Sequence, residues 1–146
     1  MRLEKSRRHK LRVHWPVSAE TFESLVASAG AAYLSEDLRP LRDVIETTSE
    51  LGDFGAYTDV VEMSLGVETF LVGDSANATL GARGERCVSP TLVVTTYLSA
   101  DLSAARVDQV ISELVSAHPW EVPVIELSET VELLTSVGAE RTEVLA

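Results

Sequence analysis

The stretch from Asp101 to Leu127 constrains the fold of this chain more than any other. Ser103 is a good N-cap, and apolar side chains then recur at i, i+3, i+4, i+7 and i+8, which predicts an amphipathic helix with one buried face. We expect this helix to end at His118-Pro119, because proline bars regular helix. Residues 122–127 are then predicted to form a strand. The apolar positions of the helix are Val107, Val110, Ile111, Leu114 and Val115.

A strand followed by a helix is also predicted near the start of the sequence. Leu11, Val13 and Trp15 alternate with polar residues, which is the period-two pattern of a half-buried strand. The next segment has an N-cap at Ser18 and a C-terminal stop at Gly30, so it predicts a helix. Its apolar face consists of Phe22, Leu25, Val26 and Ala29.

The middle of the sequence has the composition of strands. Residues 58–65 and 67–72 are rich in Val, Thr and Phe and meet at Gly66, which predicts two strands separated by a sharp break or a bulge. Residues 89–98 contain so many β-branched side chains that a helix is disfavoured and a strand is predicted.

The predicted order of strand, helix, strands, helix and strand is the split βαβ arrangement of ferredoxin-like domains. We therefore predict an α+β sandwich over residues 11–127, with two helices on one face of an antiparallel sheet. Residues 35–52 are expected to be an insertion with a short helix starting near Pro40. Residues 1–10 are expected to be a basic N-terminal arm, and residues 128–146 an acidic C-terminal extension with an additional helix or edge strand.

The charge distribution argues against nucleic acid as a partner. The net charge is -11, yet six of the twelve Lys and Arg residues lie in the first twelve positions. The remaining sequence carries six basic and 22 acidic side chains, and such a surface repels phosphate. Only the basic arm could bind nucleic acid, and its alternative interpretation is a solubilising tail.

The cysteine content and hydropathy indicate the cytoplasm. Cys87 is the only cysteine, so neither an intramolecular disulfide nor a Cys-based zinc cage can form within one chain. No apolar run approaches the length of about 18 residues that a membrane span needs, so no membrane partner is expected.

The string Ala117-His118-Pro119-Trp120-Glu121-Val122-Pro123 resembles the motif Ala-His-Pro-Tyr-Glu-x-Pro. This motif occurs in CutA-type divalent-cation tolerance proteins and in the PII-like domain inserted into dinuclear-metal-centre hexameric (NGG1-interacting-factor-like) proteins. The inserted domain looks closer, because Gly30-Ala31, Gly55-Ala56-Tyr57 and the segment 66–70 resemble its glycine-rich middle section. Trp120 stands where tyrosine is usual, which keeps the aromatic ring and removes a hydroxyl group.

The resemblance implies a PII-like homotrimer with ligands or partners at the subunit clefts. It does not imply a dinuclear metal centre, because the metal ligands of the larger proteins lie outside the inserted domain. This chain has only His9, His14 and His118, which are too few and wrongly spaced for such a site. Hydrolase chemistry is therefore not carried over.

The candidate ligand-binding residues are His118, Trp120 and Glu121, at the corner where the last helix ends. A neutral imidazole, a carboxylate and Cys87 from a neighbouring strand could bind a soft or borderline divalent ion, which makes His118, Glu121 and Cys87 the candidate metal ligands. The resemblance to CutA makes copper or zinc the first ions to test. In the alternative structural interpretation, His118 caps free carbonyl groups, Trp120 fills the edge of the core and Glu121 accepts backbone donors.

No complete catalytic constellation is present in the sequence. The glycine-containing loop 73–84 lacks Gly-Lys-Ser/Thr, and no nucleophile elbow occurs, so this loop is expected to be a recognition loop rather than a phosphate loop. We expect a non-enzymatic binding module that senses a small ligand or a divalent metal. The alternatives are a structural or protein-interaction domain without a ligand, and a small metal-dependent hydrolase that uses His118 and Glu121.

Overall fold

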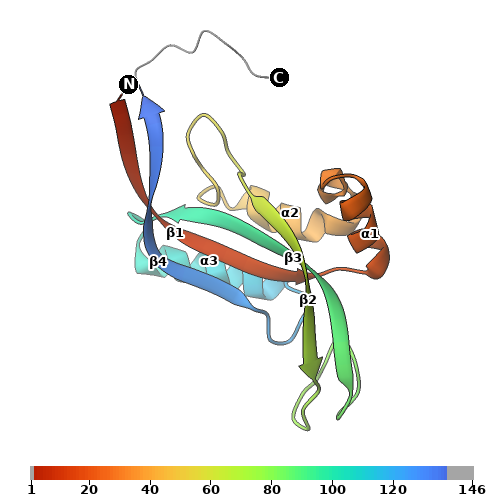
Figure 1. Cartoon of the computed structure of the whole chain (residues 1–146). Coiled ribbons are helices and arrows are strands. Elements are labelled where there is room, and N and C mark those ends of the chain that lie inside the picture. Colours follow the sequence, from red (N-terminus) through yellow and green to blue (C-terminus); the bar gives the residue numbers. More distant parts are fainter. Residues whose placement is uncertain (1, 138–146) are drawn as a thin grey trace.

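The four strands form one antiparallel sheet in the order β2-β3-β1-β4 (Figure 1). The computed structural model describes residues 2–137. The strands are β1 (Arg2–Pro16), β2 (Glu62–Leu71), β3 (Arg86–Ser99) and β4 (Ile125–Val137). This order, with helices between β1 and β2 and between β3 and β4, confirms the predicted ferredoxin-like α+β fold of the PII/CutA kind.

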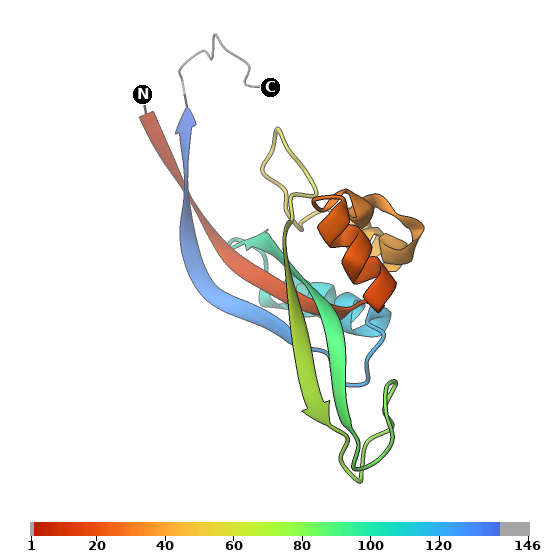
Figure 2. The same ribbon diagram turned by 45° about the vertical axis from the view of Figure 1, so that its right-hand side comes forward.

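Three α-helices cover one face of the sheet (Figure 2). They are α1 (Ala19–Ala27), α2 (Arg39–Thr47) and α3 (Ala104–Ala117), and the short 3-10 helices η1 (Ala31–Leu34) and η2 (Glu36–Leu38) connect α1 to α2. The predicted caps are confirmed: the side chains of Ser18 and Ser103 accept hydrogen bonds from the backbone N–H groups of Thr21 and Arg106. No helix within residues 2–137 is both long and apolar enough to cross a membrane.

The hydrophobic core lies between the sheet and the helices. Leu11, Val13 and Trp15 point from β1 toward the helices, and Leu92 and Val94 do so from β3. The expected insertion contributes to this core, since four of its apolar side chains are at most 2% exposed: Leu38, Leu41, Ile45 and Leu51. The segment is therefore part of the packed domain, and α2 begins at Arg39, one residue before the proline that marks its predicted start.

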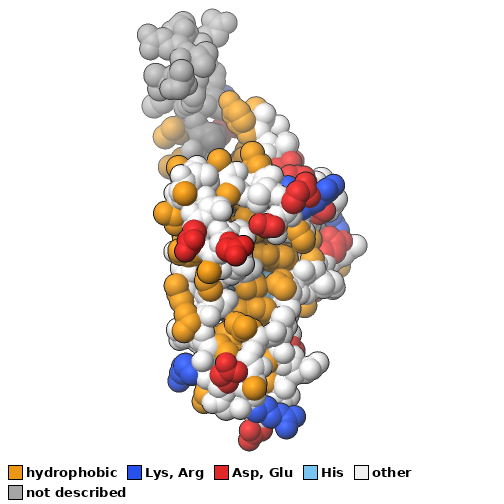
Figure 3. Space-filling view, turned by 90° about the vertical axis from the view of Figure 1, so that its right-hand side faces the viewer, with side chains coloured by type: hydrophobic (Ala, Val, Ile, Leu, Met, Phe, Trp, Pro, Cys, Tyr) orange, Lys and Arg blue, Asp and Glu red, His pale blue; other side chains and the backbone are white. Residues whose placement is uncertain are grey.

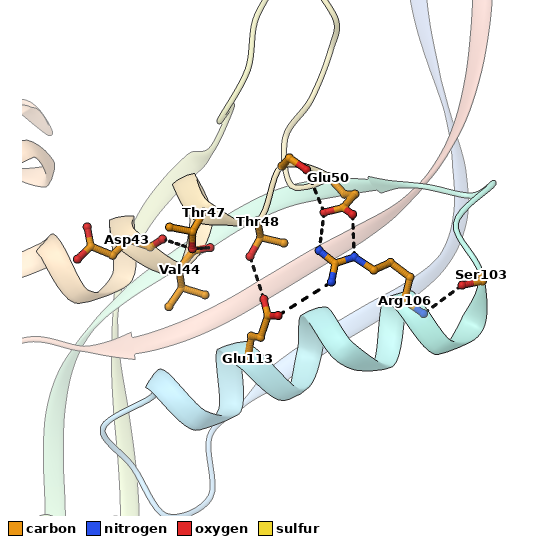
Figure 4. Close-up of polar contacts among 9 residues, drawn as sticks. Asp43, Val44, Thr47, Thr48, Glu50, Ser103, Arg106 and Glu113 are labelled. Atoms are coloured by element: carbon orange, nitrogen blue, oxygen red, sulfur yellow. Dashed lines mark hydrogen bonds and ion pairs between the residues drawn. The ribbon is translucent and has the colours of Figure 1, made fainter.

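A polar network joins the end of α2 to α3 (Figure 4). The guanidinium of Arg106 donates two hydrogen bonds to the carboxylate of Glu50, at 2.7 and 2.8 Å. Glu113 lies 4.0 Å from the same guanidinium and accepts a hydrogen bond from the buried Thr48. These contacts fix the chain segment that leaves α2.

The two outer parts of the sequence pair with each other instead of forming tails. Residues 2–10, expected as an arm ahead of the sheet, belong to β1, and β4 continues as far as Val137, so that Arg2 pairs with Val137. Lys5 and Glu132 form an ion pair across this ribbon at 3.5 Å, which extends beyond the helices in Figure 1. The rest of the expected acidic extension, residues 138–146, lies outside the described residues.

The predicted break at Gly66 is wrong. β2 is continuous from Glu62 to Leu71 and pairs with β3 along its whole length, with Gly66 opposite Thr91. Gly66 adopts no positive φ, so it supports neither a sharp turn nor a bulge at this position.

Candidate functional site

A pocket of about 550 Å³ opens beside the corner between α3 and β4. Three segments meet there: residues 68–73 at the end of β2, the loop at 76–80, and the corner at 120–124. His14 of β1 completes the wall. His14 lies between Val13 and Trp15, which face the helices, so its side chain lies on the opposite face of the sheet. The structure therefore places the pocket on the face that the helices leave open.

The lining of the pocket includes a pair of titratable side chains from β1 and β2. His14 Nδ1 lies 2.8 Å from Glu68 Oε1, and each of these side chains is only about one-fifth exposed. On the other side, His14 Nε2 lies 3.8 Å from Glu126 Oε1 of β4. Within residues 2–137 this nitrogen is buried and has no hydrogen-bond partner. One imidazole thus lies between two carboxylates.

His118 is a positioning residue behind the pocket wall. Its Nε2 donates a hydrogen bond to the backbone carbonyl of His14 at 2.6 Å, and its Nδ1 accepts one from the backbone N–H of Trp120 at 3.0 Å. This pattern requires the neutral tautomer with the proton on Nε2. The ring is 7% exposed, and burial lowers its pKa below the ordinary value. Neither ring nitrogen is free for a ligand.

Trp120 and Glu121, two of the three residues predicted from the sequence to bind a ligand, line the pocket; ligand binding by them stays a prediction. The ring of Trp120 meets the ring of Phe70 edge to face, with 5.2 Å between the centroids. Glu121 Oε2 accepts a hydrogen bond from the backbone N–H of Asn77 at 2.9 Å. Thr79 donates its hydroxyl hydrogen to the carbonyl of Pro119, also at 2.9 Å. Two hydrogen bonds therefore connect the glycine-containing loop to the corner.

Cys87 lies under the same loop and is not among the residues that line the pocket. Its side chain is 6% exposed, and Sγ lies 4.0 Å from the carbonyl oxygen of Leu80. Burial, together with the nearby Glu85, raises the pKa of the thiol. A protonated thiol is a poor metal ligand and a poor nucleophile.

The three candidate metal ligands do not form one ligand set. His118 uses both nitrogens in hydrogen bonds, Glu121 is held by the loop, and the Cys87 thiol is covered. Within the described part of the chain, no group of three or more His, Cys, Asp or Glu residues is placed to hold a metal ion. Copper or zinc binding therefore stays a prediction, and the described residues form no complete ligand set for either ion.

Sequence reasoning missed His14, Glu68 and Phe70 as pocket residues. The alternation of β1 carried a signal for His14, since it puts this residue on the face opposite Val13 and Trp15. No comparable signal existed for Glu68, which is 54 positions from its partner in the sequence. Their contact depends on the register that places β3 between β1 and β2.

Comparison with known proteins supports the fold. The chain is similar to a Bacillus cereus protein related to NIF3, with a TM-score of 0.54 and 18% identity over 90% of this chain. It spans 29% of that protein's length. It also aligns with the periplasmic divalent cation tolerance protein CutA from Archaeoglobus fulgidus, with a TM-score of 0.39, 11% identity, and coverage of 93% of this chain and 87% of that one.

No protein-family model and no curated protein sequence matches the chain. At 18% identity the similarity to the NIF3-related protein establishes the fold alone. It confirms the structural resemblance inferred from the His-Pro-Trp-Glu-Val-Pro corner.

Proposed function

We propose that this chain is a non-enzymatic binding module of the PII-like or CutA-like kind, which takes a small ligand in the pocket beside Trp120. The observation that carries the proposal is the pocket itself. Its volume of about 550 Å³ lies in the range of small-molecule sites. Its walls combine apolar side chains with a few polar groups at fixed positions, as such sites typically do.

The pocket is held in shape by contacts between its walls, which supports a binding role. His118 holds the backbone of Trp120 against β1, and the loop is attached to the corner at Glu121 and Pro119. A preformed site loses less conformational entropy when a ligand binds, so affinity is gained without additional contacts.

The geometry gives less support to the hydrolase alternative. That alternative needs His118 as a base or metal ligand, and both of its nitrogens already bind backbone groups. Cys87, the only thiol in the chain, is covered and has a raised pKa. A binding function needs neither residue to react.

The proposed assembly is a homotrimer with the ligand at or near a subunit cleft. Exposed apolar side chains on the β2–β3 hairpin support self-association, because contiguous apolar surface marks protein contacts. Figure 3 shows such side chains gathered along one face of the molecule. Those of the hairpin are Leu65, Val67, Leu71 and Val88, which are 38–62% exposed. We further propose a cytoplasmic location, on the composition described above.

Native mass spectrometry of protein purified without added metal tests both parts of the proposal. We expect three times the chain mass together with a bound small molecule. The adduct should disappear in Trp120→Ala and persist in Tyr57→Ala, because Tyr57 is also an exposed aromatic residue but does not line the pocket. A bound copper or zinc mass would identify the metal alternative. A monomer without an adduct would contradict the proposal and favour a structural or interaction role.

A further inference from the structure

We infer that the ligand of this pocket is a small organic cation with an apolar body, held by the carboxylates of Glu68 and Glu121 and the rings of Phe70 and Trp120. This inference rests on the proposed function, because it concerns the same pocket. It adds the charge and the chemical class of the molecule that the pocket accepts.

The first argument is the charge of the lining. Glu68 and Glu121 are its carboxylates, and no Lys or Arg is among the lining residues. The imidazole of His14 is paired with Glu68 and has Glu126 on its other side. Arg12, two positions from His14 on β1, is paired with Glu126 at 3.5 Å. The pocket therefore presents negative charge to whatever enters it, and in a partly buried site this selects a cation.

The second argument is the unused hydrogen-bonding capacity of these carboxylates. Glu68 uses Oε1 with His14, and Glu121 uses Oε2 with the backbone of Asn77. Among the described residues, Glu68 Oε2 and Glu121 Oε1 have no hydrogen-bond partner. A carboxylate oxygen only accepts, and an ammonium group only donates, so the two are complementary. Each carboxylate is already held in the pocket lining by its contact with the protein, which lowers the entropic cost of binding.

The third argument is the aromatic pair. The rings of Phe70 and Trp120 meet edge to face, with 5.2 Å between their centroids and an angle of 68° between their planes. The faces of the two rings therefore point in different directions. The face of an aromatic ring attracts a cation, and indole does so most strongly. The remaining wall is supplied by apolar side chains such as Leu80, Val122 and Val124. A molecule with one cationic nitrogen and a hydrocarbon body satisfies both kinds of surface.

Other ligand classes fit this lining less well. An anionic nucleotide would meet two carboxylates and no Lys or Arg side chain. A hydrated divalent ion would lose water ligands on entering the pocket. It would not gain enough oxygen or nitrogen ligands in exchange, because the described residues offer no group of three or more His, Cys, Asp or Glu side chains placed around one point. The apolar wall would also be left without a function in metal binding.

The test compares matched probes on the full chain. The three probes share a phenylethyl body and differ in charge. 2-Phenylethylammonium is the cation, 3-phenylpropanoate is the anion, and 2-phenylethanol is the neutral compound. Each is titrated while tryptophan emission is recorded, since Trp120 lies in the pocket wall. We expect saturable binding of the cation, weaker binding of the alcohol and none of the anion.

Isosteric amide variants identify the carboxylates that are responsible. Glu68→Gln and Glu121→Gln should each weaken 2-phenylethylammonium about tenfold, because each removes a charge-assisted hydrogen bond. Glu126→Gln is the matched control, since Glu126 also faces His14 but lies outside the lining, and we expect a change of less than about twofold for this more screened charge. Melting temperatures measured in parallel identify any variant that is misfolded, and Glu121→Gln leaves the His14 pair untouched.

The outcomes separate this inference from the proposed function. Binding of 3-phenylpropanoate as tight as that of the cation overturns the inference and leaves the binding module standing. Binding of no probe also overturns it; the proposed function then stands if native mass spectrometry shows an adduct and fails if it does not.

Discussion

The imidazole of His118 donates a hydrogen bond from Nε2 to the backbone carbonyl of His14, across 2.6 Å. This contact joins the end of α3 to β1, which are 104 positions apart in the sequence. Because the other ring nitrogen accepts the N–H of Trp120, the same imidazole connects the core of the sheet to the wall of the pocket. Within the motif that resembles PII-like proteins, His118 therefore packs against β1 and positions the backbone of Trp120.

Replacing His118 by Ala should destabilise the fold. The variant removes the hydrogen-bond partner of a partly buried carbonyl and a partly buried N–H and opens a gap beside Trp15, so we expect a loss of about 2–4 kcal/mol in the free energy of unfolding. Urea denaturation measures this loss. His9→Ala is the control, because His9 also contacts a backbone carbonyl, that of Ser128 at 2.9 Å, but in the less buried ribbon. Equal losses in the two variants would contradict the positioning role of His118.

Stability should fall as the pH is lowered through the range in which an unfolded histidine titrates. Burial lowers the pKa of His118 in the folded state below the ordinary 6.5, so the unfolded chain binds a proton more readily. The stabilising contribution is fully present above about pH 6.5 and is lost as the pH falls toward the lowered pKa of the folded state. The urea midpoint, measured in steps from neutral to mildly acidic pH, should show this loss. In His118→Gln the fall over this interval should be smaller, and an unchanged fall would assign it to other groups.

The Glu50–Arg106 pair should hold the segment after α2 against α3, and its stabilising effect should persist to a much lower pH than that of His118. The two hydrogen bonds from Arg106 lower the pKa of Glu50 to about 2. Because this pKa is depressed, the contribution is present above the unfolded value of about 4.5 and is lost as the pH falls toward about 2. Glu50→Gln should cost about 1 kcal/mol at neutral pH, since the pair is bidentate and partly buried.

Glu36→Gln is the matched control for this pair. Glu36 also binds an arginine, Arg39 at 3.2 Å, but their side chains are 81% and 61% exposed. An exposed pair of this kind is screened by water and contributes little to stability. Chemical denaturation at neutral pH and near pH 3 compares the variants. If Glu50→Gln were no more costly than Glu36→Gln, the network in Figure 4 would not contribute to stability.

The elements with one buried face could be predicted from the sequence. α3 with its Ser103 cap and α1 carry periodic apolar residues, the strand at 89–98 carries a high density of β-branched residues, and the structure confirms all three. The pairing of residues 2–10 with β4 could not be predicted, because the described side chains of this ribbon, those of residues 2–10 and 128–134, are exposed or half-buried and show no clear apolar face in the sequence. Of the residues predicted to bind a ligand, Trp120 and Glu121 line the pocket. Trp120 and Glu121 lie in one local motif, whereas Glu68 reaches the pocket only through the register of three strands.

Gly81 should be required for the loop that closes over Cys87. Its φ is +87°, and a Cβ at this position would collide with the sulfur of Cys87 and crowd Val72. Gly81→Ala should therefore combine backbone strain with a steric clash and cost about 2 kcal/mol more than a substitution that brings strain alone. Gly84→Ala is such a substitution, because Gly84 has a φ of +76° and a Cβ added there would meet no other atom within 4 Å.

The reactivity of Cys87 separates a local effect of Gly81→Ala on the loop from a general loss of stability. In the wild-type chain the thiol is buried and its pKa is raised, so a disulfide reagent should label it slowly. If Gly81→Ala lifts the loop from the sheet, labelling under native conditions should accelerate, and binding of a ligand that needs Asn77 and Thr79 in place should weaken. Gly84→Ala should label at close to the wild-type rate. Equal acceleration in both variants would mean that loop strain, and not the contact with Cys87, controls access to the thiol.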